Sequence, residues 1–151
     1  MSSVNGKRVL MGALAGAVVW SVWTGIVTMG ILNPAYHAEQ SLGHLLAKPR
    51  YGAGIFFFSW ALTVLLVSGT GAWIYAVMRG SRGAGPRTAL KIGLVLGFAA
   101  GFPVDLSILT WLPVTPIVPL FWMVDIWGGV ILATLVAAFL YKDNKQLLVE
   151  T

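Results

Sequence analysis

Hydrophobic residues occur in four long runs that are separated by short polar segments. The runs occupy residues 9–32, 53–78, 88–112 and 116–141. A helix needs about 20 mainly apolar residues to cross the hydrocarbon core of a bilayer, and each run reaches that length. The first run is also too long for the apolar core of a signal peptide, which has about 7–15 residues. The pattern therefore predicts four transmembrane helices in a single membrane domain, residues 1–151.

The polar segment after the first run predicts a short amphipathic helix over residues 34–48. Asn33 followed by Pro34 is a typical helix start, with a capping side chain before a proline in the first turn. Three leucines follow at helical spacing, at Leu42, Leu45 and Leu46. Because its other side is polar, we expect this helix to lie in the membrane interface.

Basic residues are distributed unequally between the two ends of the predicted helices. Eight lie in the termini and in the segment after the second run, at Lys7, Arg8, Arg79, Arg82, Arg87, Lys91, Lys142 and Lys145. Only Lys48 and Arg50 lie at the other end. The positive-inside rule then places both termini and a basic turn, residues 79–87, in the cytoplasm. Short connections make successive helices antiparallel neighbours, so the predicted fold is an all-α, up-down bundle of four transmembrane helices.

Composition supports a membrane protein and narrows its chemistry. The chain is 58% hydrophobic and 10% charged, whereas a soluble domain carries about 25% charged residues. Its net charge of +5 suits contact with anionic lipid, and no soluble domain is predicted that could hold a basic patch for nucleic acid. The absence of cysteine excludes disulfides, thiolate metal sites and cysteine nucleophiles.

Small residues recur at every fourth position of three predicted helices. Residues at this spacing form one narrow stripe, and small side chains allow two membrane helices to approach closely. We expect the stripes of the last two helices to bring these helices together. A shorter stripe on the first helix is available for another contact. The positions are Gly12 and Gly16, then Gly93, Gly97 and Gly101, then Gly129 and Ala133.

Two aspartates, Asp105 and Asp125, extend the last two stripes. Each lies roughly 10 Å from the outer end of its helix, so we expect them to face each other or a common pocket. A carboxylate in hydrocarbon costs about 2.5–3.5 kcal/mol on insertion scales and needs a partner. They could share a proton, pair with Arg50, or accept hydrogen bonds. The candidate donors are Ser21, Thr24, Ser59, Thr63, Trp122 and Trp127. The pair is then a packing contact, a proton or cation site, or a contact with another subunit.

His37 and His44 are two helical turns apart on the predicted outer helix, and Glu39 lies near them. Imidazole and carboxylate groups are ligands for zinc, copper or iron. Their spacing is not a metal-binding signature, so the alternatives are histidines of a wet interfacial helix or a quinone or cofactor contact. The sequence leaves the cofactor undetermined.

No catalytic motif is present, since the chain has no phosphate-binding glycine loop, nucleophile elbow or Ser-His-Asp set. The preferred hypothesis is therefore an accessory or structural subunit of a larger membrane complex. One alternative is a homo-oligomeric proton- or cation-coupled transporter or channel that uses the aspartates. Another is a membrane enzyme or cofactor-binding protein that uses the outer histidines. The expected partners are the lipid bilayer and either other membrane subunits or a second copy of the chain.

Overall fold

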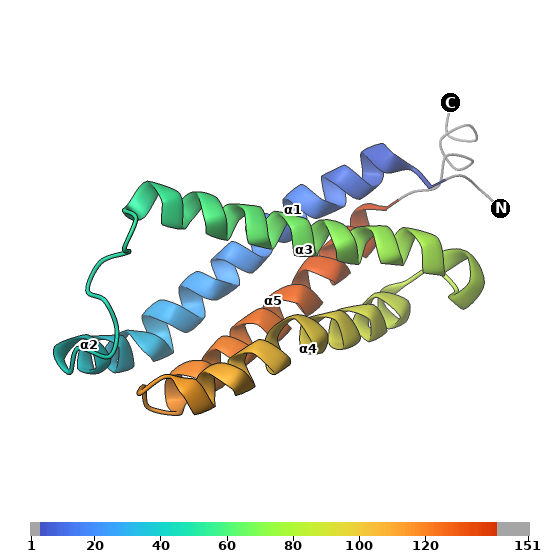
Figure 1. Cartoon of the computed structure of the whole chain (residues 1–151). Helices are drawn as coiled ribbons and strands as arrows, with labels where there is room; N and C mark the ends of the chain where they lie inside the picture. The colour runs from blue at the N-terminus through green and yellow to red at the C-terminus, as the bar shows by residue number, and fades with distance from the viewer. Residues whose placement is uncertain (1–3, 142–151) are drawn as a thin grey trace.

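The structure is a computed structural model and describes residues 4–141. Within this range the chain forms helices and loops and no strand (Figure 1). The elements are α1 (Gly6–Val27), the π-helix η1 (Thr28–Leu32), α2 (Asn33–Ser41), α3 (Ala53–Arg82), α4 (Pro86–Trp111) and α5 (Ile117–Leu140). Four helical stretches are long and apolar enough to cross a membrane: Gly6–Ser41, α3, α4 and α5. The prediction of an all-helical chain with four such helices is confirmed.

The first helical stretch runs further than the sequence predicts. α1 passes through η1 into α2 without a break. Asn33 has helical backbone angles, φ −54° and ψ −47°, so it does not cap a new helix as expected. Pro34 has no N–H, so an α-helix at this point lacks the hydrogen bond that residue 34 would donate to the preceding turn. The wider π turn lies directly before Pro34. A proline in this sequence context therefore changes the hydrogen bonding of the helix and does not start a separate one.

α2 is shorter than the amphipathic helix predicted over residues 34–48, because it ends at Ser41. Gly43 has a positive φ of 77°, a conformation that glycine adopts readily and that commonly ends helices. The three leucines of the predicted apolar stripe lie beyond Ser41, in a loop of residues 42–52. We call α2, this loop and the link between α4 and α5 the Glu39 end of the bundle.

α5 lies at the centre of the bundle and packs against α4, α1 and α3. It runs antiparallel to α1, with Gly12 against Ala137 and Gly16 against Ala133. A Cβ atom at Gly16 would lie 3.0 Å from the Ala133 carbonyl oxygen, so a larger residue would force the two backbones apart. α4 also runs antiparallel to α5, and Gly97 lies against Trp127. Close backbone approach at glycine thus fixes both pairs of helices.

The glycine stripe of α4 lies against α5 as predicted, but the small-residue stripe of α5 does not face it, so the prediction is wrong for α5. Gly129 of α5 lies against Trp20 of α1, and Ala133 also faces α1. The glycines of α4 instead contact bulky residues on another side of α5. The pairs are Gly93 with Ile131, Gly97 with Trp127 and Gly101 with Ile126. α5 therefore offers a side of small residues to α1 and a side of large residues to the glycines of α4.

The predicted basic turn of residues 79–87 is mostly helical. α3 continues to Arg82 and α4 begins at Pro86, which leaves a link of residues 83–85. Gly83 and Gly85 have positive φ values of 86° and 132°, which allow the chain to reverse direction over this short distance. We call this link, with residues 4–8 and Tyr141, the Arg82 end. Lys142 and Lys145, part of the predicted charge asymmetry, lie outside the described residues.

Contacts at the Arg82 end hold the start of α1 against the end of α5. The Tyr141 hydroxyl accepts the Asn5 N–H at 2.9 Å. Arg79 donates to the Tyr141 carbonyl at 3.2 Å, and its guanidinium lies 4.9 Å from the centre of the Tyr141 ring. Tyr75 stacks edge-on against the same ring at 6.3 Å. Three helices therefore meet at Tyr141.

Candidate functional site

Asp125 of α5 is buried against α1. The Thr24 hydroxyl lies 2.9 Å from Oδ1 and 3.1 Å from Oδ2 of this carboxyl group, to which it donates. The Trp23 indole N–H donates to the Asp125 carbonyl oxygen at 3.1 Å. Thr24 is among the donors that the sequence suggests, whereas the contact with the main chain from Trp23 was not predicted. These two neighbouring residues of α1 hold the aspartate at the contact between α1 and α5.

Asp105 of α4 is also buried, with 3% of its surface exposed. Its position one turn beyond Gly101 places it on the side of α4 that faces α5. Its Oδ2 atom is fully buried and has no hydrogen-bond partner among the described residues. A buried carboxyl oxygen without a partner is costly, so Asp105 needs a proton or a ligand to satisfy it.

Four other residues predicted to bind the aspartates have different contacts in the described part of the chain. Arg50 is exposed in the loop before α3, with its guanidinium 5.8 Å from the centre of the Tyr51 ring. Ser59 and Thr63 are exposed on α3, and the Thr63 hydroxyl donates to the Ser59 carbonyl at 2.9 Å. Trp122 donates its indole N–H to the Tyr36 hydroxyl. Among residues 4–141, none of these four therefore forms a hydrogen bond with either carboxyl group.

Glu39 of α2 is a buried carboxylate whose role sequence reasoning missed. It is 1% exposed, and its Oε1 accepts the Thr115 N–H at 3.0 Å from the link between α4 and α5. Its Oε2 accepts from His44 Nδ1 at 2.8 Å. Glu39 thus joins three segments of the Glu39 end. Its position one turn before Leu42, in line with the predicted apolar stripe, was the available signal, because a buried carboxylate needs donors.

Within residues 4–141, the two histidines and Glu39 are not brought together as one set of ligands. His37 is exposed on α2, whereas His44 contacts the carboxylate from the following loop. Across residues 4–141, no group of three or more histidine, cysteine, aspartate or glutamate side chains is placed to hold a metal ion. The predicted common face of the two histidines is lost because α2 ends between them.

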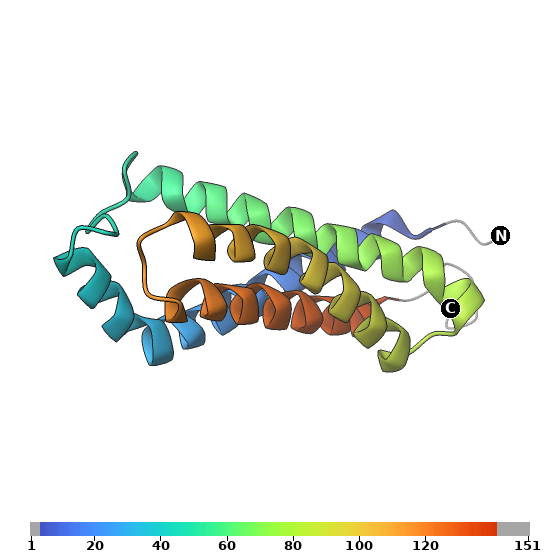
Figure 2. The same ribbon diagram turned by 60° about the horizontal axis from the view of Figure 1, so that its bottom comes forward.

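The first turns of α3 are not covered by the other residues of the range 4–141, a feature that sequence reasoning missed. Residues 53–59 are all exposed, whichever side of the helix they occupy, and we call them the uncovered segment. Contact with the bundle begins at Trp60, whose ring packs edge-on against that of Trp20 with 6.1 Å between the ring centres. The contact continues along α3 through Val64 and Ser68. Figures 1 and 2 show this part of α3 standing apart from α2, joined to it by the loop of residues 42–52.

Comparison with known protein families, curated proteins and solved structures finds no match to this chain.

Proposed function

We propose that this chain is an accessory subunit of a larger membrane complex and that the uncovered segment of α3 is its contact with a neighbouring subunit. The observation that carries the proposal is the exposure of every residue from 53 to 59. The proposal includes insertion of the four apolar helices into a membrane as an up-down bundle. Both termini then lie on the cytoplasmic side, as the positive-inside rule predicts.

The composition of the uncovered segment favours a protein neighbour. Membrane helices associate through small and hydroxyl-bearing residues, because these permit close backbone approach and interhelical hydrogen bonds. The segment combines such residues with three large aromatic rings, which supply contact area. The small and hydroxyl-bearing positions are Ala53, Gly54 and Ser59, and the rings are Phe56, Phe57 and Phe58.

The way α3 meets its own bundle also supports this assignment. From Trp60 onwards, one side of α3 is directed inward through Val64, Ser68 and Ala72. Phe56 and Phe57 would continue this side by one turn, yet they are 51% and 66% exposed. All sides of α3 are therefore exposed around Phe56 and Phe57, which leaves room for a second helix to pack there.

Truncation of two exposed phenylalanines should release the chain from its complex. We expect Phe57→Ala/Phe58→Ala to lose the co-purifying subunits, because it removes contact area without opening a cavity in the chain's own core. The measurement is affinity purification from the native membrane in mild detergent, followed by the mass of the purified particle.

The matched control is Val18→Ala/Val22→Ala, which truncates two exposed apolar residues of α1. This control should keep the mass of the wild-type particle. Purification of the wild-type chain at the mass of a monomer or a homo-oligomer would contradict the proposal.

A second candidate function is proton or cation transfer through Asp105. The observation that favours it is the buried Oδ2 atom, which has no partner among residues 4–141. Carboxyl groups in membrane helices commonly mark proton or ion pathways. In this version the protein acts as a homo-oligomer, since four helices offer little room for a complete pathway.

Replacement of Asp105 tests this second candidate. Liposomes that contain the wild-type protein and a pH-sensitive dye should dissipate a proton gradient, and Asp105→Asn should reduce the rate to that of empty liposomes. The amide has a similar shape but does not exchange a proton near neutral pH. Ser107→Ala alters an exposed polar residue of the same helix and should retain the flux. Equal flux in wild-type and Asp105→Asn liposomes would exclude this function.

A further inference from the structure

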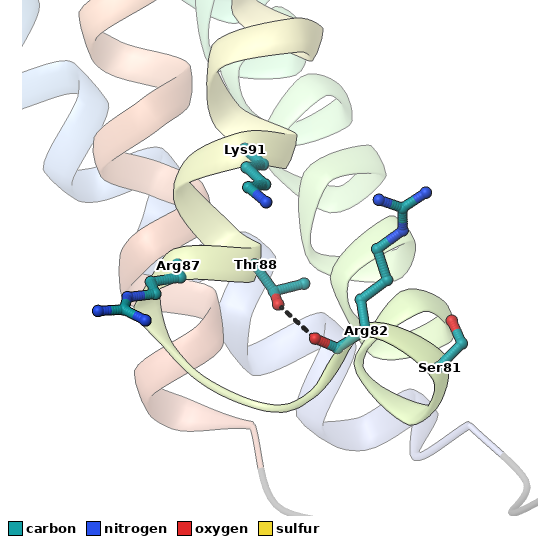
Figure 3. A pocket seen from close by; sticks show the side chains of 5 residues that line it. All are labelled: Ser81, Arg82, Arg87, Thr88 and Lys91. Atoms are coloured by element: carbon teal, nitrogen blue, oxygen red, sulfur yellow. Dashed lines mark hydrogen bonds between the residues drawn. The ribbon is translucent and has the colours of Figure 1, made fainter.

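A basic hollow lies between the end of α3 and the start of α4. Its volume is about 470 Å³, and five residues line it: Ser81, Arg82, Arg87, Thr88 and Lys91. Figure 3 shows Lys91 and Arg82 extending from the two helices on either side of the hollow, while Arg87 extends away from it. Three of the five lining residues are therefore cationic, and two of these cations flank the same space.

Carboxylates do not neutralise this charge within residues 4–141. The aspartates and glutamate of that range are Glu39, Asp105 and Asp125. Glu39 binds Thr115 at the other end of the bundle, and Asp125 binds Thr24. Asp105 lies fourteen residues beyond Lys91 on the same helix, or roughly 20 Å along its axis. The basic hollow therefore presents net positive charge to an anion.

Hydrogen bonds hold the floor of the hollow in place. The Thr88 hydroxyl lies 2.8 Å from the Gly83 carbonyl and 3.4 Å from the Arg82 carbonyl, and it donates to these two oxygens. The Tyr75 hydroxyl accepts the Gly85 N–H at 3.0 Å. The link between α3 and α4 is thus tied to both helices.

Apolar residues continue from the basic hollow along both helices. Val77 lies one turn from Ser81 on α3, and Val95 lies one turn from Lys91 on α4. They are 47% and 71% exposed. A ligand whose phosphate occupies the hollow could therefore place hydrocarbon chains against these side chains. A phospholipid can contact both the charged and the apolar parts of this surface. A free phosphate ion can contact only the charged part.

We propose that the basic hollow binds the phosphate group of an anionic phospholipid. Arg82 and Lys91 hold the phosphate from the two sides, and Arg87 attracts the headgroup from the rim. Basic pockets between membrane helices commonly bind lipid headgroups in this way. This inference concerns the Arg82 end and is independent of the subunit contact proposed for the uncovered segment.

Lipid retention by the purified full-length chain tests the proposal. The protein is exchanged into detergent that contains equal amounts of phosphatidylglycerol and phosphatidylcholine, and native mass spectrometry counts the lipids that remain bound. The wild-type protein should retain phosphatidylglycerol preferentially. Arg82→Gln/Lys91→Gln should weaken this preference at least about tenfold, because each basic residue near a lipid surface contributes appreciably to binding.

A charge-matched control separates the hollow from net charge. Lys48→Gln/Arg50→Gln removes two positive charges at the Glu39 end and should retain the wild-type preference. All four substituted side chains are exposed, so we expect both variants to keep the helical content and melting temperature of the wild-type protein. Circular dichroism checks this before the lipids are counted. An equal loss of phosphatidylglycerol in the two variants would overturn the proposal. Displacement of the bound lipid by millimolar inorganic phosphate would also overturn it, and would assign the hollow to the free ion.

Discussion

Replacing Gly129 with alanine should severely destabilise the bundle. Its new Cβ atom would overlap the indole ring of Trp20, which is 1% exposed. Trp20 packs against Trp60 and Val64 of α3 and Val130 of α5, so the ring cannot move without displacing these two helices. Overpacking commonly costs 1–3 kcal/mol and occasionally more, and we expect about 3 kcal/mol or more here. Unfolding of the purified chain by SDS in mixed micelles, followed by circular dichroism, measures this loss.

Gly25→Ala is the matched control for this substitution. A Cβ atom at Gly25 of α1 would meet nothing within 4 Å. We expect this variant to be as stable as the wild-type protein or slightly more stable, since alanine is favoured over glycine in a helix by about 1 kcal/mol. If Gly129→Ala matched Gly25→Ala in stability, the described contact between α1 and α5 would be incorrect.

Thr24→Val should also weaken the contact between α1 and α5. Valine has nearly the shape of threonine but lacks the hydroxyl that donates to both Asp125 oxygens. Asp125 is 5% exposed and would keep its buried carboxyl group without this donor. Loss of one partner from a buried polar pair costs about 1–3 kcal/mol, and more when the remaining group is charged. The same unfolding experiment in mixed micelles measures the change in the free energy of unfolding.

Thr70→Val controls for the loss of a threonine hydroxyl in general. Thr70 is exposed on α3, and its hydroxyl donates to the Leu66 carbonyl of its own helix. Its replacement should change the free energy of unfolding by less than about 0.5 kcal/mol, as is usual for surface substitutions. A similar loss in Thr24→Val and Thr70→Val would mean that the bond to Asp125 does not stabilise the bundle.

The four long helices could be predicted from the sequence because runs of apolar residues have the length of a membrane span. The start of α3 and both ends of α4 and α5 were predicted to within two residues. The ends of the first helical stretch and the carboxyl-terminal end of α3 were not, since they depend on local backbone geometry. Pro34 lies inside a continuous helical stretch, where a proline usually marks a helix start or break. Gly43, Gly83 and Gly85 adopt positive φ values that end α2 and reverse the chain after α3, and nothing in the spacing of apolar residues specifies these angles.

The partners of each helix were harder to predict than the helices themselves. The four-residue spacing of Gly93, Gly97 and Gly101 correctly marks a close helix contact, but it does not specify the side chains opposite. These are Ile131, Trp127 and Ile126, and the small residues of α5 face α1 instead. A stripe identifies a surface, whereas the choice among several such surfaces depends on the packing of all helices together.

The candidate site was predictable only in part for the same reason. Asp105 and Asp125 were identified because a carboxyl group in an apolar helix is costly and needs a partner. Thr24 was one of several possible donors, and only the geometry of α1 against α5 distinguishes it from Ser59 or Thr63. The uncovered segment carries no sequence signal that separates it from the rest of α3, because burial is a property of the whole bundle.

Site-specific photocrosslinking at Phe57 in the native membrane tests the proposed subunit contact most directly. A photoreactive phenylalanine analogue replaces Phe57 in one variant and Phe139, an exposed phenylalanine of α5, in the control. The account predicts that irradiation of the Phe57 variant gives a heavier product containing this chain and a different membrane protein, and that the Phe139 variant does not give this product. Absence of any protein adduct at Phe57, or an adduct of two copies of this chain, would contradict it.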